Sequence, residues 1–239
     1  MPVRERIILS LDTHDPEYAL QLVDRFSEEL HIFKVGLELF TAGGPEIIRR
    51  ITQKGKKVFL DLKLHDIPNT VSRTAKVATR LGVFMLNMHT SGGLDMMKQT
   101  RDAVVETCLK ENLPRPKLIG VTVLTSLTSE ALKNELCIPH SVRTQVKHLS
   151  RLAFNAGLDG VVASGQEIEM IKNSCGKDFL VVVPGIRLSW NPPDDQKRTV
   201  TPREAFRTGA DYIVLGRAIM REEDPLKALR LVLLDLMST

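Results

Sequence analysis

Four ionisable side chains fall within positions 61–66 of the chain: Asp61, Lys63, His65 and Asp66. The apolar residues just before them are typical of a buried strand. Because side chains alternate along a strand, Asp61 and Lys63 share one face. Carboxylates beside an ammonium group keep it protonated, so these residues could donate a proton or stabilise a developing negative charge.

The same residues have two other interpretations. Asp61, His65 and Asp66 could hold Mg²⁺ through oxygen ligands, but the ammonium group of Lys63 already supplies a cation there, so we predict no metal. His65 and His89 lack a second ligand at metal-binding spacing on their own elements, which favours orienting or packing roles. A structural network of ion pairs would also perturb pKa values without catalysis. Function is favoured because desolvating several charges costs free energy.

Eight short apolar runs alternate with longer amphipathic stretches along the chain. The predicted strands are 7–11, 33–37, 58–63, 84–89, 118–124, 160–163, 179–183 and 212–215. The predicted helices are 16–30, 45–54, 69–81, 94–111, 142–156, 167–173, 202–208 and 225–237. No linker or change of composition interrupts this alternation. It therefore predicts an α/β fold, a single (β/α)8 TIM barrel that spans 1–239 as one domain.

Active sites in such barrels lie where the strands end at their carboxyl side. The polar residues at or near these ends are Asp12, Lys34, Asp61, Lys63, His89, Thr125, Ser126, Arg187 and Arg217. This set predicts a polar pocket for an anionic ligand. After the last strand, Gly216 would let backbone N–H groups approach a phosphate and Arg217 would grip it, although a plain turn with a solvated arginine is the alternative. The irregular stretch 187–200 is typical of a lid.

Composition limits the partners and the compartment. The net charge of +4 comes from Lys and Arg spread along the chain, and aromatic residues make up 5%, so we predict no nucleic-acid partner. Cys108, Cys137 and Cys175 lie far apart without metal spacing and are typical of reduced thiols. No apolar run approaches the roughly 18 residues that span a bilayer. We predict a soluble cytoplasmic protein without a membrane partner.

The run 61–70, Asp-Leu-Lys-Leu-His-Asp-Ile-Pro-Asn-Thr, closely resembles the signature of the orotidine 5'-phosphate decarboxylase family. Weaker matches follow in the family's order at 10–12, 34–36, 123–126, 184–187, 196 and 215–217. The resemblance implies a homodimeric barrel that decarboxylates orotidine 5'-monophosphate to uridine 5'-monophosphate, the last step of pyrimidine synthesis, without a cofactor. No fused orotate phosphoribosyltransferase domain is recognised, so the monofunctional bacterial type is expected.

The resemblance also implies roles for single residues. Lys34, Asp61, Lys63 and Asp66 would form the catalytic charge network, with Lys63 giving its proton to C6 of the pyrimidine. Asp66, Ile67 and Thr70 would reach across the dimer interface into the partner's site. The implied substrate contacts are Asp12 and Lys34 with the ribose, Thr125, Ser126 and Gln196 with the pyrimidine and the closing loop, Arg187, Gly216 and Arg217 with the phosphate, and also Asp61 and Thr70.

Two alternatives stay open. Mg²⁺-dependent sugar-phosphate decarboxylases and aldolases resemble this family in the barrel and in an Asp-x-Lys-x-x-Asp pattern. The segment 67–70 and the pair Thr125-Ser126 favour the nucleotide enzyme over them. A catalytically silent protein that binds phosphoribosyl ligands is the other alternative. A binder of an anionic ligand has no need for a buried carboxylate such as Asp61, so the complete charge network argues against it.

Overall fold

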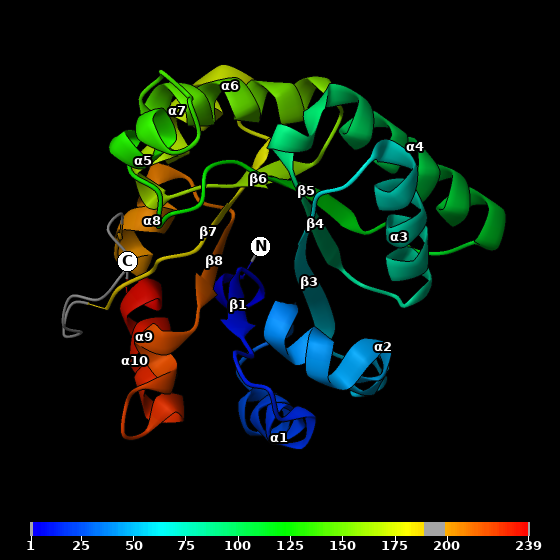
Figure 1. Cartoon of the computed structure of the whole chain (residues 1–239). Helices are drawn as coiled ribbons and strands as arrows, with labels where there is room; N and C mark the ends of the chain where they lie inside the picture. The colour runs from blue at the N-terminus through cyan, green and yellow to red at the C-terminus, as the bar shows by residue number, and fades with distance from the viewer. Residues whose placement is uncertain (1, 189–198, 239) are drawn as a thin grey trace.

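Eight parallel strands close into a barrel in the computed structural model, which describes residues 2–188 and 199–238 (Figure 1). Each strand pairs with its neighbour in sequence, and β1 closes the ring by pairing with β8. The strands are β1 Ile7–Ser10, β2 Ile32–Gly36, β3 Lys57–Leu64, β4 Met85–His89, β5 Lys117–Val121, β6 Gly160–Val162, β7 Leu180–Val183 and β8 Tyr212–Leu215. The predicted (β/α)8 TIM barrel is confirmed.

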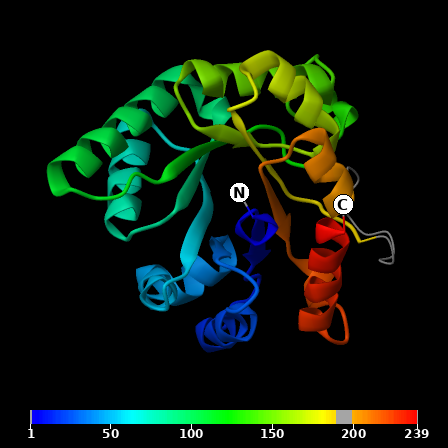
Figure 2. The ribbon, with the colours of Figure 1, turned by 180° about the vertical axis from the view of Figure 1, so that it is seen from behind.

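Helices surround the strands, as Figures 1 and 2 show from opposite sides. They are α1 Pro16–Phe26, α2 Leu37–Gln53, α3 Pro68–Arg80, α4 Gly93–Glu111, α5 Ser129–Asn134, α6 Val142–Asn155, α7 Ile168–Cys175, α8 Pro202–Thr208, α9 Arg217–Met220 and α10 Pro225–Met237, with 3-10 turns η1 Val3–Glu5, η2 Thr90–Gly92 and η3 Gly165–Glu167. Every predicted helix overlaps one of these, whereas α5 and α9 were not predicted. Within the described residues, no helix has the length and apolar character needed to cross a membrane.

Helix α2 begins at Leu37, earlier than the predicted start at residue 45. Gly44 interrupts it with φ 55° and ψ −158°, a conformation that glycine adopts at little cost. Pro45 then starts the second part, where its missing N–H group does no harm. The prediction was wrong for the first part because a Gly-Gly-Pro sequence usually marks a loop.

The barrel interior has an apolar floor and a polar rim. Seven inward side chains form the floor, a buried cluster separate from the larger core between strands and helices: Ile8, Ile32, Phe59, Met85, Ile119, Val182 and Tyr212. Two positions further along the first four strands stand Ser10, Lys34, Asp61 and Asn87. Strand alternation therefore carries polar groups from four adjacent strands to one end of the barrel.

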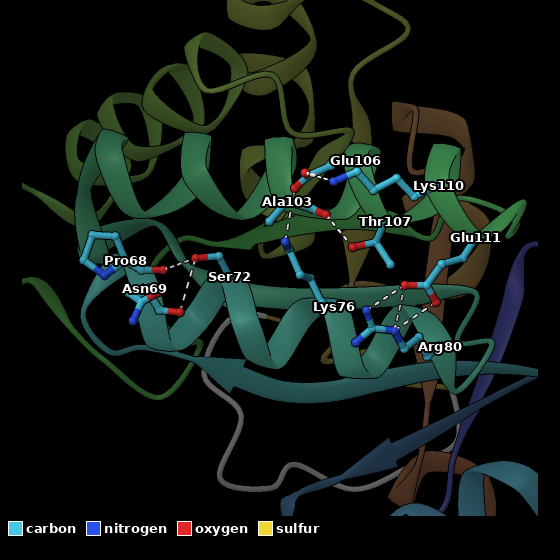
Figure 3. Close-up of polar contacts among 10 residues, drawn as sticks. All are labelled: Pro68, Asn69, Ser72, Lys76, Arg80, Ala103, Glu106, Thr107, Lys110 and Glu111. Carbon is cyan, nitrogen blue, oxygen red and sulfur yellow. Dashed lines mark hydrogen bonds and ion pairs between the residues drawn. The ribbon is translucent and has the colours of Figure 1, made fainter.

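Helices α3 and α4 lie side by side on the outside, joined by ion pairs on their exposed faces (Figure 3). Glu106 accepts hydrogen bonds from Lys76 Nζ at 3.1 Å and from Lys110 Nζ at 2.6 Å. Arg80 donates to both carboxylate oxygens of Glu111. We call these five residues the surface ladder. They lie in the C-terminal halves of α3 and α4.

Candidate active site

Strand β3 is irregular where it carries Lys63. Its register against β4 shifts between Leu60 and Leu64, and Lys63 itself has φ 50°. This left-handed conformation is uncommon for a residue with a side chain. The backbone N–H of Lys63 donates to Oδ1 of the Asn87 side chain at 2.8 Å, outside the normal ladder of backbone hydrogen bonds. The end of β3 is therefore shaped by a side chain on β4.

The rim carries an alternating chain of charges from three adjacent strands. Lys63 Nζ lies 2.7 Å from Asp61 Oδ1, and Asp61 Oδ2 lies 3.4 Å from Lys34 Nζ. Lys34 Nζ in turn lies 3.3 Å from Asp12 Oδ1. The side chains of Asp61 and Lys34 are 11% and 12% exposed, so these charges are largely removed from water. We call Asp12, Lys34, Asp61 and Lys63 the rim cluster.

Two buried polar residues support the rim cluster. Asn87 Nδ2 donates to Asp61 Oδ1 at 2.6 Å, and Ser10 Oγ donates to Asp12 Oδ1 at 2.6 Å. Neither residue was predicted to be part of the site, although Ser10 lies in the matched segment 10–12. The sequence did contain a signal for Asn87, a polar residue within an apolar strand. Asn87 lies two residues before His89 in β4, so both side chains face the same side of the strand.

A cavity of about 150 Å³ opens beside the rim cluster. Its lining residues are Lys34, Phe59, Asp61, Lys63, Val121, Val123, Leu124, Thr125, Val162, Ala163, Pro184 and Val214. Charged groups from β2 and β3 therefore face a wall that is mostly apolar. Such a site suits a flat ring whose polar substituent points at the charges.

The end of β8 packs closely against the rim cluster. A Cβ atom at Gly216 would lie 3.2 Å from Asp12 Oδ2 and 3.3 Å from Ser10 Cβ, so a larger residue would crowd both. Arg217 follows directly and begins α9. After the end of β7, the half-buried Arg187 donates its backbone N–H to Val200 O at 3.0 Å. Two arginines thus follow the last two strands, where barrels commonly bind phosphate.

Comparison with known proteins decides the family. The family model described as "Orotidine 5'-phosphate decarboxylase / HUMPS family" matches residues 5–232. The chain belongs to this family. A protein of Moorella thermoacetica named orotidine 5'-phosphate decarboxylase is 47% identical over 232 residues, which are 97% of this chain and 92% of that protein. The protein of that name from Pelobacter propionicus is 45% identical, over 96% of this chain and 94% of its own.

Solved structures agree. The crystal structure of orotidine 5'-phosphate decarboxylase from Lactobacillus acidophilus has a TM-score of 0.85 and 34% identity, and the match covers 97% of this chain and 99% of that one. The enzyme from Pyrococcus horikoshii, at 24% identity and a TM-score of 0.76, shares the barrel fold. Membership of the decarboxylase family therefore rests on sequence and fold together.

The other predicted site residues differ in whether they line the cavity or are exposed to solvent. Thr125 lines the cavity, whereas Ser126 is exposed and does not. Asp66, Ile67 and Thr70 are exposed, and Asp66 Oδ1 accepts a hydrogen bond from the N–H of Ile67 at 2.7 Å. Within the described parts of the chain, no ion pair joins Asp66 to Lys63 or another cation. Gln196, predicted to contact the pyrimidine, lies outside the described residues.

Two histidine rings stand beside the cluster, with the centroids of His65 and His89 5.3 Å apart. Burial lowers the pKa of His89, and the nearby His65 and Lys63 lower it further against the opposing effect of Asp61. Burial and the two neighbouring groups therefore favour the neutral form of the His89 ring. Over residues 2–188 and 199–238, no three His, Cys, Asp or Glu side chains are grouped as ligands for a metal ion.

Proposed function

We propose that this chain decarboxylates orotidine 5'-monophosphate to uridine 5'-monophosphate and CO₂, the last step of de novo pyrimidine synthesis. The observation that carries the proposal is the ammonium group of Lys63, held 2.7 Å from Asp61 at the charged end of an apolar cavity. The proteins of this name that are 44–47% identical over nearly the whole chain support it. The chain is a carboxy-lyase.

The chemistry requires electrostatic help at one carbon atom. When the bond from C6 to the carboxylate breaks, CO₂ leaves and the electron pair stays in an sp² orbital perpendicular to the ring π system. Delocalisation therefore cannot stabilise it. The Lys63 ammonium is proposed to stabilise this pair and then transfer one proton to C6, becoming a neutral amine that regains a proton from water. No cofactor takes part in this scheme.

The remaining predicted residues are proposed to bind the nucleotide. Asp12 and Lys34 would hold the ribose hydroxyls, and Thr125, Ser126 and Gln196 the pyrimidine and closing loop. Arg187, Gly216 and Arg217 would hold the phosphate. Support comes from the end of β8, where a Cβ atom added at Gly216 would lie 3.2 Å from Asp12 Oδ2, so the residues proposed to bind the phosphate and the ribose are neighbours. Binding energy at the phosphate, remote from C6, can then raise kcat as well as lower KM.

We further propose a cytoplasmic homodimer in which Asp66, Ile67 and Thr70 enter the partner's site. The exposure of Ile67, at 67%, and the absence of an ion pair to Asp66 among the described residues support such an arrangement. In the dimer, Asp66 would supply the second carboxylate beside the partner's Lys63. The free thiols of Cys108, Cys137 and Cys175 support a reducing compartment.

The test follows the ultraviolet absorbance of orotidine 5'-monophosphate with purified protein, in buffer and with excess EDTA. Loss of substrate at equal rates in both establishes a decarboxylase that needs no removable metal ion. Loss only without EDTA points to a metal-dependent enzyme. Tight binding of the nucleotide without turnover points to a silent binding protein.

A further inference from the structure

Asn87 is the buried residue that joins the two reactive side chains of β3. It lies on β4 with none of its surface exposed. Its Oδ1 accepts from the backbone N–H of Lys63 at 2.8 Å, and its Nδ2 donates to Asp61 Oδ1 at 2.6 Å. The same Asp61 oxygen accepts from Lys63 Nζ at 2.7 Å. A closed ring of three hydrogen bonds thus connects Asn87, Asp61 and Lys63.

Chemistry fixes the orientation of this amide. A backbone N–H group can only donate, so the side-chain oxygen of Asn87 must face Lys63. The NH₂ group then faces Asp61, whose carboxylate can only accept when ionised. Each partner therefore demands the opposite end of the amide. Leucine, although similar in size, can satisfy neither partner, and aspartate can satisfy only one.

The position of Asn87 matches the two unusual features of the site. Lys63 has φ 50°, a backbone conformation that persists only when its surroundings enforce it. The β3 register shift spans this residue, so the normal strand ladder does not define where its side chain points. Asp61 also has its second oxygen near Lys34, and a donor on Oδ1 sets the rotation of the carboxylate between the two lysines.

We propose that Asn87 is a positioning residue for decarboxylation: it aims the Lys63 ammonium at C6 by holding the Lys63 backbone and the Asp61 carboxylate at once. This inference rests on the proposed function. Asn87 does not line the cavity, whereas Asp61 and Lys63 do, so its effect passes through these two residues. Its loss is expected to lower kcat far more than nucleotide affinity.

The test compares Asn87→Leu and Asn87→Asp with the wild type. The readouts are kcat, KM, the dissociation constant for uridine 5'-monophosphate and the melting temperature. Asn87→Leu is expected to lower kcat by about 100-fold, the scale of a misplacement near 1 Å, with the dissociation constant changed less than about five-fold. Asn87→Asp keeps an acceptor for the Lys63 N–H but sets a carboxylate against Asp61, and it is expected to lose a similar factor.

Thr100→Val is the matched control. Thr100 is equally buried, and its hydroxyl donates to Met96 O within α4, away from the barrel interior. This variant is expected to lower the melting temperature and leave kcat unchanged. If Asn87→Leu also loses melting temperature alone, Asn87 is merely structural and the inference is overturned.

Other outcomes are equally decisive. Wild-type kcat in Asn87→Asp overturns the inference, because the donor to Asp61 would then be dispensable. This variant keeps the size and one hydrogen bond of asparagine, so it provides the test if Asn87→Leu does not fold. A wild-type protein that binds but does not turn over orotidine 5'-monophosphate overturns the proposed function itself, and the inference with it.

Discussion

Two sets of alternating charges, the rim cluster and the surface ladder on α3 and α4, both pair carboxylates with cations, but the centre of the rim cluster is far less exposed. In the ladder, Lys110 and Glu106 are 71% and 48% exposed and approach to 2.6 Å. In the rim cluster, Lys34 and Asp61 are 12% and 11% exposed, yet they stand 3.4 Å apart. Of these two pairs the exposed one is closer, although in the rim cluster Lys63 Nζ also lies 2.7 Å from Asp61 Oδ1.

The difference indicates separate purposes. Exposed pairs are screened by water and salt and lose side-chain entropy when they form, so even a close pair contributes little to stability. Largely buried charges interact strongly and are costly when unpaired. Lys34 is shared between Asp12 and Asp61 at longer distances, which leaves it able to exchange a partner for a hydroxyl group of a ligand. This arrangement supports the proposed role of the rim cluster in binding and reaction.

The largest expected effect comes from breaking the rim cluster at its reactive end. Lys63→Ala should lower kcat by about 10⁴-fold or more, because the proton donor and the stabilising charge are both lost. Affinity for uridine 5'-monophosphate, measured by calorimetry, should stay within about ten-fold. Lys110→Ala, in the surface ladder, is the control and should turn over like the wild type. Turnover near the wild-type rate in Lys63→Ala would remove Lys63 from its role.

A second prediction extends the rim cluster across the proposed dimer. Asp66→Asn should lower kcat by about 100-fold, because the partner's Lys63 loses one of its two carboxylates. Mixing Lys63→Ala and Asp66→Asn proteins after mild dissociation should restore activity to about a quarter of wild type, since half the dimers become mixed and each holds one intact site. Mixed samples as inactive as the separate variants would place Asp66 outside the partner's site.

A third, smaller effect concerns His89 beside the rim cluster. Because its pKa in the folded chain lies below the ordinary 6.5, the unfolded chain takes up the proton first as the pH falls. Stability should therefore decrease from about pH 6.5 downward until the folded chain is protonated as well. His89→Gln should flatten this part of the curve in denaturant titrations at several pH values. An identical slope in both proteins would contradict the assignment.

The smallest effect is expected in the surface ladder. Hydrogen bonds from Lys110 and Lys76 lower the pKa of Glu106, so its contribution is present at neutral pH and disappears as the pH falls through the folded value. Since the group is exposed, Glu106→Gln should shift the melting temperature at pH 7 by no more than about 2 °C, with activity unchanged. A larger loss of melting temperature would show that the exposed pairs of the surface ladder contribute more to stability than their exposure predicts.

Much of the architecture was predictable because it follows from local patterns. Each predicted strand overlaps an observed one, and the strand ends brought Asp12, Lys34, Asp61 and Lys63 together as expected. Helices α5 and α9 have 6 and 4 residues, too few for a helical period to stand out. The contact between Asn87 and Lys63 was not predictable, because it depends on a register shift between strands and on a left-handed residue.

The pairing of β1 with β8 has a consequence for the order in which a ribosome makes the protein. Asp12, Lys34, Asp61 and Lys63 all emerge within the first 63 residues, but Gly216 is added more than 150 residues later. Until β8 docks on β1, the emerging rim charges remain open to water and the proposed phosphate site does not exist. We therefore expect nascent chains to be unable to capture the nucleotide until synthesis is almost complete.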